Sequence, residues 1–333
     1  MRKIHGSALP RLLLLPLESQ LDRVGRRLMQ PDGAPRFDFR QPLGEEALLP
    51  PDSVSWRIFK NPISLFIGGV AAVILELAEP AVRTGVWEHS SFRKDTVGRL
   101  QRTGLAAMIT VYGARSRAEK MIAGVVRQHD RVGGTTPDGR SYKANDPDLL
   151  DWVQATATFG FTMAYSRYVS QLSAEEISQA FAEAQVPGRL YGARNTPTSL
   201  SGWEKMLAEM KPRLEPSAII DEFLWLVSEA EAFPAVLRPL QRSMVRAAVA
   251  LVPQDVQHML GLPHRYRMRL GEENLLRQAG SMADRLVLPS LPPAQSCLRL
   301  GLPADYLYHW IPDALPDFTP PPALRATSGS GRG

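Results

Sequence analysis

Two cations and a hydroxyl lie at helical spacing near the middle of the first half of the chain, at Arg99, Arg102 and Thr103. Residues three and four positions apart share one face of an α-helix, so these side chains are expected to point the same way. Such a face can bind an anionic group or hydrogen-bond an oxygen atom. The alternative is that Arg99 and Arg102 are ordinary solvated charges.

A single imidazole follows at the end of the next predicted helix, at His129. A neutral imidazole can ligate a metal ion. The alternative is that His129 lies beside the last helix carbonyls, where the helix dipole favours a cation.

Several common catalytic motifs are absent from the sequence. It contains no G-x-G-x-x-G after a strand, no Walker A loop and no G-x-S-x-G elbow. The six histidines are never four residues apart, and none follows a glutamate by three positions. This excludes an H-E-x-x-H zinc helix and argues against a ferritin-like di-iron bundle. Cys297 is the only cysteine, which excludes an intrachain disulfide and a cysteine-based metal cluster.

The elements that position these residues are predicted to be helices. Asp95 or Thr96 caps a helix that runs to Gly113, and Ser116 caps the next, which covers about residues 117–131. After a loop at residues 133–145, Asp146 and Pro147 begin a long helix that reaches about residue 168.

Helical patterns continue to about residue 286. A capping box at residues 173–176 begins a short helix to Gln185. Further helices are predicted near residues 200–211, 216–231, 236–251 and 272–286. No run of alternating apolar and polar residues predicts a strand. We therefore expect an all-α fold.

The composition is typical of one large globular domain, because 44% of the 333 residues are hydrophobic and 22% are charged. We expect an N-terminal arm at residues 1–55, a helical domain at 56–290 and a C-terminal extension at 291–333. The end of the extension is rich in Pro, then in Gly and Ser, which predicts partial disorder. The net charge of +5 is spread along the chain and does not indicate nucleic-acid binding.

Two apolar segments bear on membrane contact. Residues 63–78 are fewer than the about 20 that a spanning helix needs and include Glu76, which favours a buried central helix and leaves peripheral membrane contact open. The run at residues 12–17 is interrupted by Pro16, and no small-residue cleavage site follows it. The sequence therefore favours a cytoplasmic location over export.

An ordered series of motifs between residues 81 and 160 carries a family resemblance. The series includes GVWEHSSF at 85–92, RLQRT at 99–103, HDRVG at 129–133 and LLDWV at 149–153, with YKANDP at 142–147. In this order and spacing the chain resembles the family that joins bacterial latex-clearing rubber oxygenases and fungal ER-bound mpaB-type oxygenases. The resemblance is clear over about residues 55–160 and reaches, more weakly, to about 290.

The resemblance implies an all-helical fold with a globin-like core around haem b, in which dioxygen is used to cleave carbon–carbon double bonds of isoprenoid chains. It implies that His129 is the proximal iron ligand and that Arg99, Arg102 and Thr103 lie at the haem. It also implies a glutamate base near the haem, for which Glu79 is the candidate. A carboxyl in an apolar pocket has a raised pKa, which suits a proton acceptor.

The leading hypothesis is a haem b-dependent oxygenase that acts with dioxygen on a small apolar, isoprenoid- or lipid-like substrate. Aromatic residues of the 146–168 helix, Phe159, Phe161 and Tyr165, are expected to wall the substrate pocket. The alternative is a non-catalytic helical protein that binds apolar ligands and has lost the haem. Gln154 and Glu79 motivate it, because many family members carry histidines there. The sequence leaves the product and the oligomeric state open.

Overall fold

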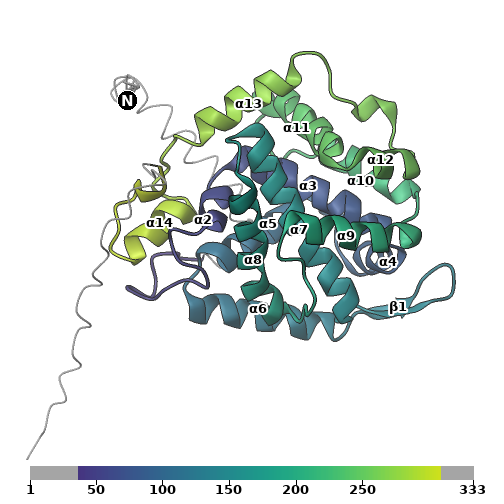
Figure 1. Cartoon of the computed structure of the whole chain (residues 1–333), viewed down its shortest axis with the longest axis horizontal. Helices are drawn as coiled ribbons and strands as arrows, with labels where there is room; N and C mark the ends of the chain where they lie inside the picture. Colours follow the sequence, from purple (N-terminus) through teal and green to yellow (C-terminus); the bar gives the residue numbers. More distant parts are fainter. Residues whose placement is uncertain (1–36, 309–333) are drawn as a thin grey trace, which may run out of the picture.

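The computed structural model describes residues 37–308, which form thirteen α-helices and one small sheet (Figure 1). The predicted all-α fold is confirmed. Residues 1–36 and 309–333 lie outside this range, and so do the apolar run at 12–17 and most of the predicted extension. The helices are α2 (Val54–Phe59), α3 (Pro62–Ala78), α4 (Pro80–His89), α5 (Thr96–Tyr112), α6 (Arg115–His129), α7 (Pro147–Tyr168), α8 (Ala174–Tyr191), α9 (Leu200–Met210), α10 (Ala218–Glu229), α11 (Arg238–Leu251), α12 (Gln254–Met259), α13 (Glu272–Ala283) and α14 (Pro292–Arg299).

Helices α3 and α7 form the centre of the molecule (Figure 1). Each begins with a side-chain cap followed by proline, Asn61 before Pro62 and Asp146 before Pro147, and the second of these starts was predicted from the sequence. The two backbones touch where Gly68 of α3 meets Gly160 of α7, because a Cβ on Gly68 would lie 2.6 Å from the Gly160 carbonyl oxygen. The absence of side chains at both positions therefore allows the central helices to pack closely.

Gly160→Ala is expected to lower the free energy of unfolding by about 1–3 kcal/mol, because its methyl group would collide with the backbone of α3. Gly124→Ala is the matched control, since a Cβ there has only the far end of Arg127 within 4 Å. Alanine is the better helix former by about 1 kcal/mol, so the control should be neutral or stabilising. Urea unfolding measures both, and equal stability of the two variants would contradict the proposed contact.

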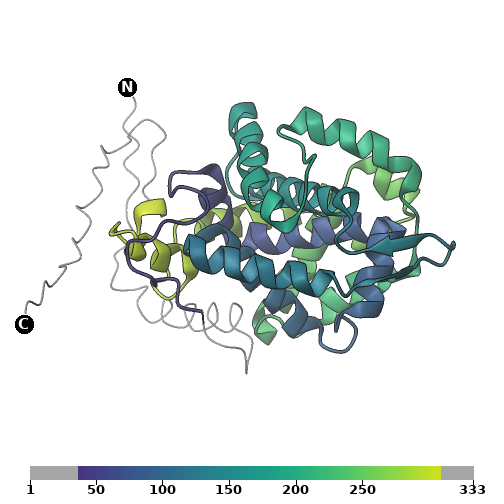
Figure 2. The same cartoon turned by 90° about the horizontal axis from the view of Figure 1, so that it is seen from below.

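A second hydrophobic cluster joins the two ends of the described chain. Residues 37–53 pack with α14 against α5 and α6, and Figure 2 shows this segment beside α14. Arg299 of α14 is buried and donates to the carbonyl oxygens of Phe39 and Glu45, at 2.8 Å each. The segment before α2 is thus held to the domain by polar as well as apolar contacts.

Two helix boundaries differ from the prediction. Helix α6 begins at Arg115 instead of after Ser116, because the carboxylate of Glu45 accepts hydrogen bonds from the Ser116 backbone N–H and hydroxyl. The cap is thus supplied from 71 residues away, which local sequence cannot indicate. Helix α8 continues past the predicted end at Gln185, through Pro187, and terminates at Gly192, whose φ is 104°.

The predicted loop at residues 133–145 forms a hairpin that projects from one end of the molecule (Figure 1). Its antiparallel strands are β1 (Gly133–Thr135) and β2 (Ser141–Lys143), and Gly139 in the turn has a φ of 89°. The sequence did not predict these strands, because three residues are too few to show the alternation of apolar and polar residues that marks a strand.

Helices α3 and α4 meet at Glu79 with a bend of 110°. Within residues 37–308, none of the helices is by itself long and apolar enough to span a bilayer. The bent pair α3–α4 meets the criteria of length and composition when its two parts are taken together.

Candidate functional site

Arg99 of α5 is electrostatically coupled to titratable side chains of two other helices, Glu76 of α3 and His129 of α6. The Arg99 guanidinium is close enough to lower the pKa of both the Glu76 carboxyl and the His129 imidazole, and Glu76 in turn raises the pKa of Arg99. Titratable groups that perturb one another inside a fold are typical of functional sites. We treat these residues as the candidate site.

The Glu76 carboxyl has an unusually high proton affinity. Burial raises its pKa to about 7, and the opposing effects of Arg99 and of a hydrogen bond from Thr156 only partly offset this. Thr156 of α7 donates to Oε1 at 3.4 Å, and the Glu76 side chain makes no ion pair with other described residues. The Glu76 carboxyl is surrounded by protein atoms, but the residue is only half-buried, so part of its surface is accessible to solvent. A carboxyl of this kind can accept a proton near neutral pH.

Arg99 is a half-buried cation whose guanidinium makes no hydrogen bond or ion pair with any residue in 37–308. Burial lowers its pKa, the neighbouring charge of Arg102 does so further, and Glu76 opposes both. Arginines that leave water usually find a partner. The guanidinium is therefore available to bind an anionic group or to polarise a bound ligand.

His129 is the last residue of α6 and is also half-buried. Burial is the largest influence on its pKa and lowers it, Asn145 and Asp130 raise it, and Arg99 lowers it. The net lowering favours the neutral imidazole at pH 7. Nδ1 is buried and has no partner at standard hydrogen-bond geometry, and Nε2 makes no hydrogen bond to the described residues. A neutral imidazole with a free nitrogen is the form that ligates iron.

The helices that carry Arg99 and His129 pack loosely on the described part of the chain. None of the α5 residues before Met108 is buried, and in α6 only Ala118 and Ile122 are buried. Apolar side chains such as Leu100 and Val126 are consequently half-exposed. Accessible apolar surface therefore lies on the same helices as the two polar residues.

Arg102 and Thr103 are both exposed, unlike Arg99. Arg102 pairs with Asp95 at 3.0 Å and donates to the Ser91 hydroxyl at 2.6 Å. The Thr103 hydroxyl donates to the carbonyl oxygen of Arg99 at 2.9 Å. Of the three residues predicted to share a face, the structure brings only Arg99 into electrostatic contact with Glu76 and His129.

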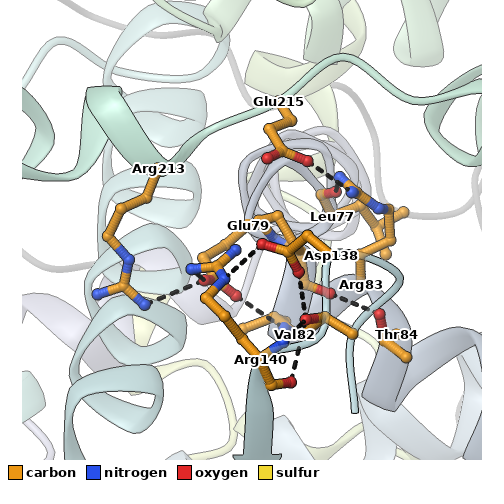
Figure 3. Close-up of polar contacts among 11 residues, drawn as sticks. Leu77, Glu79, Val82, Arg83, Thr84, Asp138, Arg140, Arg213 and Glu215 are labelled. Atoms are coloured by element: carbon orange, nitrogen blue, oxygen red, sulfur yellow. Dashed lines mark hydrogen bonds and ion pairs between the residues drawn. The ribbon is translucent and has the colours of Figure 1, made fainter.

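Glu79 is fully buried in a separate polar cluster at the α3–α4 bend (Figure 3). Its Oε2 accepts the backbone N–H of Val82 at 2.9 Å and so caps α4. Its Oε1 pairs with Arg213 at 3.0 Å and with Arg140 of the hairpin at 4.0 Å. Both oxygens are engaged, so Glu79 joins the bend to the hairpin and to the segment after α9.

Glu79→Ala is expected to lower the free energy of unfolding by about 1–3 kcal/mol, because it removes a helix cap and leaves the Arg213 guanidinium without its carboxylate, while Arg140 keeps its ion pair with Asp138. This is less than the about 3–5 kcal/mol typical of a fully buried pair, because both arginines are partly exposed. The exposed Glu204, changed to Ala, is the control for chemical denaturation. If Glu79→Ala kept full stability but lost activity, Glu79 would be the base and not a structural anchor.

Of the aromatic residues of α7 expected to wall a pocket, Phe159 and Tyr165 are buried and Phe161 is half-buried, and all three pack against protein side chains. Phe159 stacks on Trp203 with 4.7 Å between ring centroids, and Phe161 contacts Phe59 at 4.8 Å. The Tyr165 hydroxyl donates to Asp284 at 3.2 Å. A surface groove of about 770 Å³ between the end of α7 and α13 shares no residue with the candidate site.

Glu76 is the site residue that the sequence interpretation missed. The available signal was a single carboxylate within the apolar segment at residues 63–78. Burying a carboxylate is energetically costly, so an acidic residue in a buried helix suggests a partner or a function. The resemblance instead directed attention to Glu79, three residues later.

Comparison with known families defines the class of protein as an oxygenase catalytic domain. The chain matches a family model over residues 56–284, and it belongs to the family of the ER-bound oxygenase mpaB/B'/rubber oxygenase catalytic domain. The resemblance noted in the sequence is confirmed. The protein is therefore an oxidoreductase whose reaction takes dioxygen and a substrate. Neither the curated proteins nor the solved structures contain a match.

Proposed function

We propose that the protein is a haem b-dependent oxygenase that acts on a small apolar, isoprenoid- or lipid-like substrate. The observation that carries the proposal is the half-buried imidazole of His129, whose lowered pKa favours its neutral form and whose Nε2 makes no hydrogen bond within residues 37–308. It lies in the electrostatic neighbourhood of Arg99, which has no partner within the same range, and Arg99 is in turn coupled to the protonatable Glu76. Membership of an oxygenase family supports the same reading.

The donor set fits a haem better than a metal ion held by protein alone. Among the described residues, no group of three or more His, Cys, Asp or Glu side chains could hold a metal ion. Haem, by contrast, would need only one ligand from the protein, and His129 would supply it. When bound, haem supplies the activation of dioxygen that side chains lack.

The residues of this chain then have distinct tasks. His129 would ligate the iron. Arg99 would bind a haem propionate or polarise a bound ligand. Arg102 and Thr103, exposed on the same helix, would meet the polar edge of the haem. The half-exposed apolar surface of α5 and α6 would cover the ring and exclude water.

Glu76 would be the proton acceptor of the reaction. Its Oε1 lies 3.4 Å from the Thr156 hydroxyl, and its Oε2 makes no hydrogen bond to the described residues, so Oε2 would be the oxygen that takes a proton from the substrate. The pKa of about 7 lets the same carboxyl release that proton again near neutral pH.

The proposal is tested by titrating the purified protein with haemin and recording the Soret absorption. Arg99→Gln is expected to weaken haem binding about 10- to 100-fold, the usual effect of losing a hydrogen bond to a charged group. Arg189→Gln, which changes an exposed arginine of α8, should leave the affinity unchanged. A wild-type protein that binds apolar ligands but never haem would support the non-catalytic alternative and overturn the proposal.

A further inference from the structure

The hairpin after α6 returns the chain to the end of that helix. Gly133 pairs with Lys143 across the two strands, and Ala144 donates from its backbone N–H to the Val132 carbonyl at 2.9 Å. The next residue, Asn145, thereby lies beside the last turn of α6, which ends with His129.

The orientation of the Asn145 amide is determined by its neighbours. Its Nδ2 donates to the Val126 carbonyl oxygen at 3.0 Å and to the Asp130 carboxylate at 2.6 Å. Both partners can only accept, so the amide nitrogen must face them and the amide oxygen must face elsewhere. That oxygen, Oδ1, is buried and has no partner at standard hydrogen-bond geometry.

His129 provides the matching unsatisfied atom. Its Nδ1 is buried and also lacks a partner at standard geometry. The Asn145 side chain is nevertheless near enough to raise the pKa of the imidazole through hydrogen bonding, against the larger lowering effect of burial. Buried polar atoms in native proteins are nearly always paired, and a hydrogen bond between these two atoms would satisfy both.

We propose that Asn145 is the positioning residue of His129: its amide oxygen accepts a hydrogen bond from Nδ1–H and so presents the lone pair of Nε2 to the haem iron. A partner on the second nitrogen commonly fixes the tautomer and orientation of a metal-binding histidine. The hydrogen bond is a property of the protein without haem, whereas its consequence for iron rests on the proposed function.

The hydrogen bond is tested first in the haem-free protein, by ¹⁵N NMR of the histidine ring nitrogens. Wild-type His129 is expected to carry its proton on Nδ1, and Asn145→Ala is expected to shift the population toward Nε2–H. Asn274→Ala, at an exposed position of α13, is the control. A wild-type imidazole protonated on Nε2, or a tautomer that Asn145→Ala leaves unchanged, would overturn the proposal.

The consequence for iron is tested by haem affinity and by the reduction potential of the haem. Asn145→Ala is expected to weaken haem binding about 10- to 100-fold, as other losses of a ligand's hydrogen-bond partner do. The exchange Asn145→Asp with Asp130→Asn keeps an acceptor at 145 and a donor at 130, so it should restore the affinity. Because the restored acceptor is anionic, it should also lower the reduction potential below that of the wild type.

The two proposals fail in different ways. A wild-type protein with the expected tautomer that binds no haem would overturn the proposed function and leave the hydrogen bond established. A haem protein whose affinity and potential are unchanged by the substitution Asn145→Ala would overturn the role of Asn145 alone.

Discussion

His129→Ala is expected to abolish the Soret absorption of the haem-titrated protein. The imidazole is the proposed iron ligand, and of the side chains in the candidate site it is the one that would bind haem iron well. Because the ring is half-buried and the proposed hydrogen bond to Asn145 is its only side-chain polar contact within residues 37–308, its removal should cost little stability. The loss of haem should therefore occur in a folded protein, as circular dichroism would show.

Two further variants make this result specific. His258→Ala changes an exposed histidine of α12 and should leave the spectrum unchanged. Imidazole added to His129→Ala should restore part of the absorption, since the deleted ring leaves space that it can occupy. An unaltered Soret band in His129→Ala would show that another residue ligates the iron.

Glu76→Gln is expected to reduce the turnover number by about 10²- to 10⁴-fold while haem binding is retained, the usual effect of losing a general base. Wild-type activity should rise with pH through about 7, because only the ionised carboxyl can accept a proton. The residual activity of the Gln variant should lack this dependence. A pH profile that is identical in both proteins would exclude Glu76 as the base.

Glu76→Gln is expected to increase the stability of the protein, although it lowers the activity. The pKa of Glu76 is raised from 4.5 to about 7 in the folded protein, so folding disfavours its ionised form. The wild type should lose stability as the pH rises from 4.5 to 7, and Gln should not. At pH 8 the Gln variant is expected to be more stable by on the order of 2–3 kcal/mol, and below pH 4.5 the two should be equal. Thermal unfolding of the haem-free proteins at both pH values measures this difference.

Local signals predicted the helices that carry the site, but not the site itself. Asp95, Gly113 and Asp146 mark helix ends through caps that act within three or four residues, so α5 and the start of α7 could be predicted. The start of α6 depends on Glu45, whose contribution comes from a distant segment.

The side chains of the site were harder to predict, because their surroundings also depend on residues outside the local sequence. Helical spacing placed Arg99, Arg102 and Thr103 on one face, yet Asp95 and Ser91 hold Arg102 at the surface. Glu76 and Glu79 are three residues apart in the sequence. Only the bend between α3 and α4 decides that the second becomes a helix cap with two arginine partners while the first stays without an ion pair.

The contact between Gly68 and Gly160 has a consequence for how relatives of this protein can diverge. Because the backbones of α3 and α7 approach closely there, a larger side chain at either glycine would push the helices apart, and conserving the contact keeps Glu76 and Thr156 in their mutual placement. The inner sides of α5 and α6 carry no such constraint, since few of their residues are buried. Substitutions that change the choice of substrate should therefore accumulate on α5 and α6, while the position of the carboxyl is inherited unaltered.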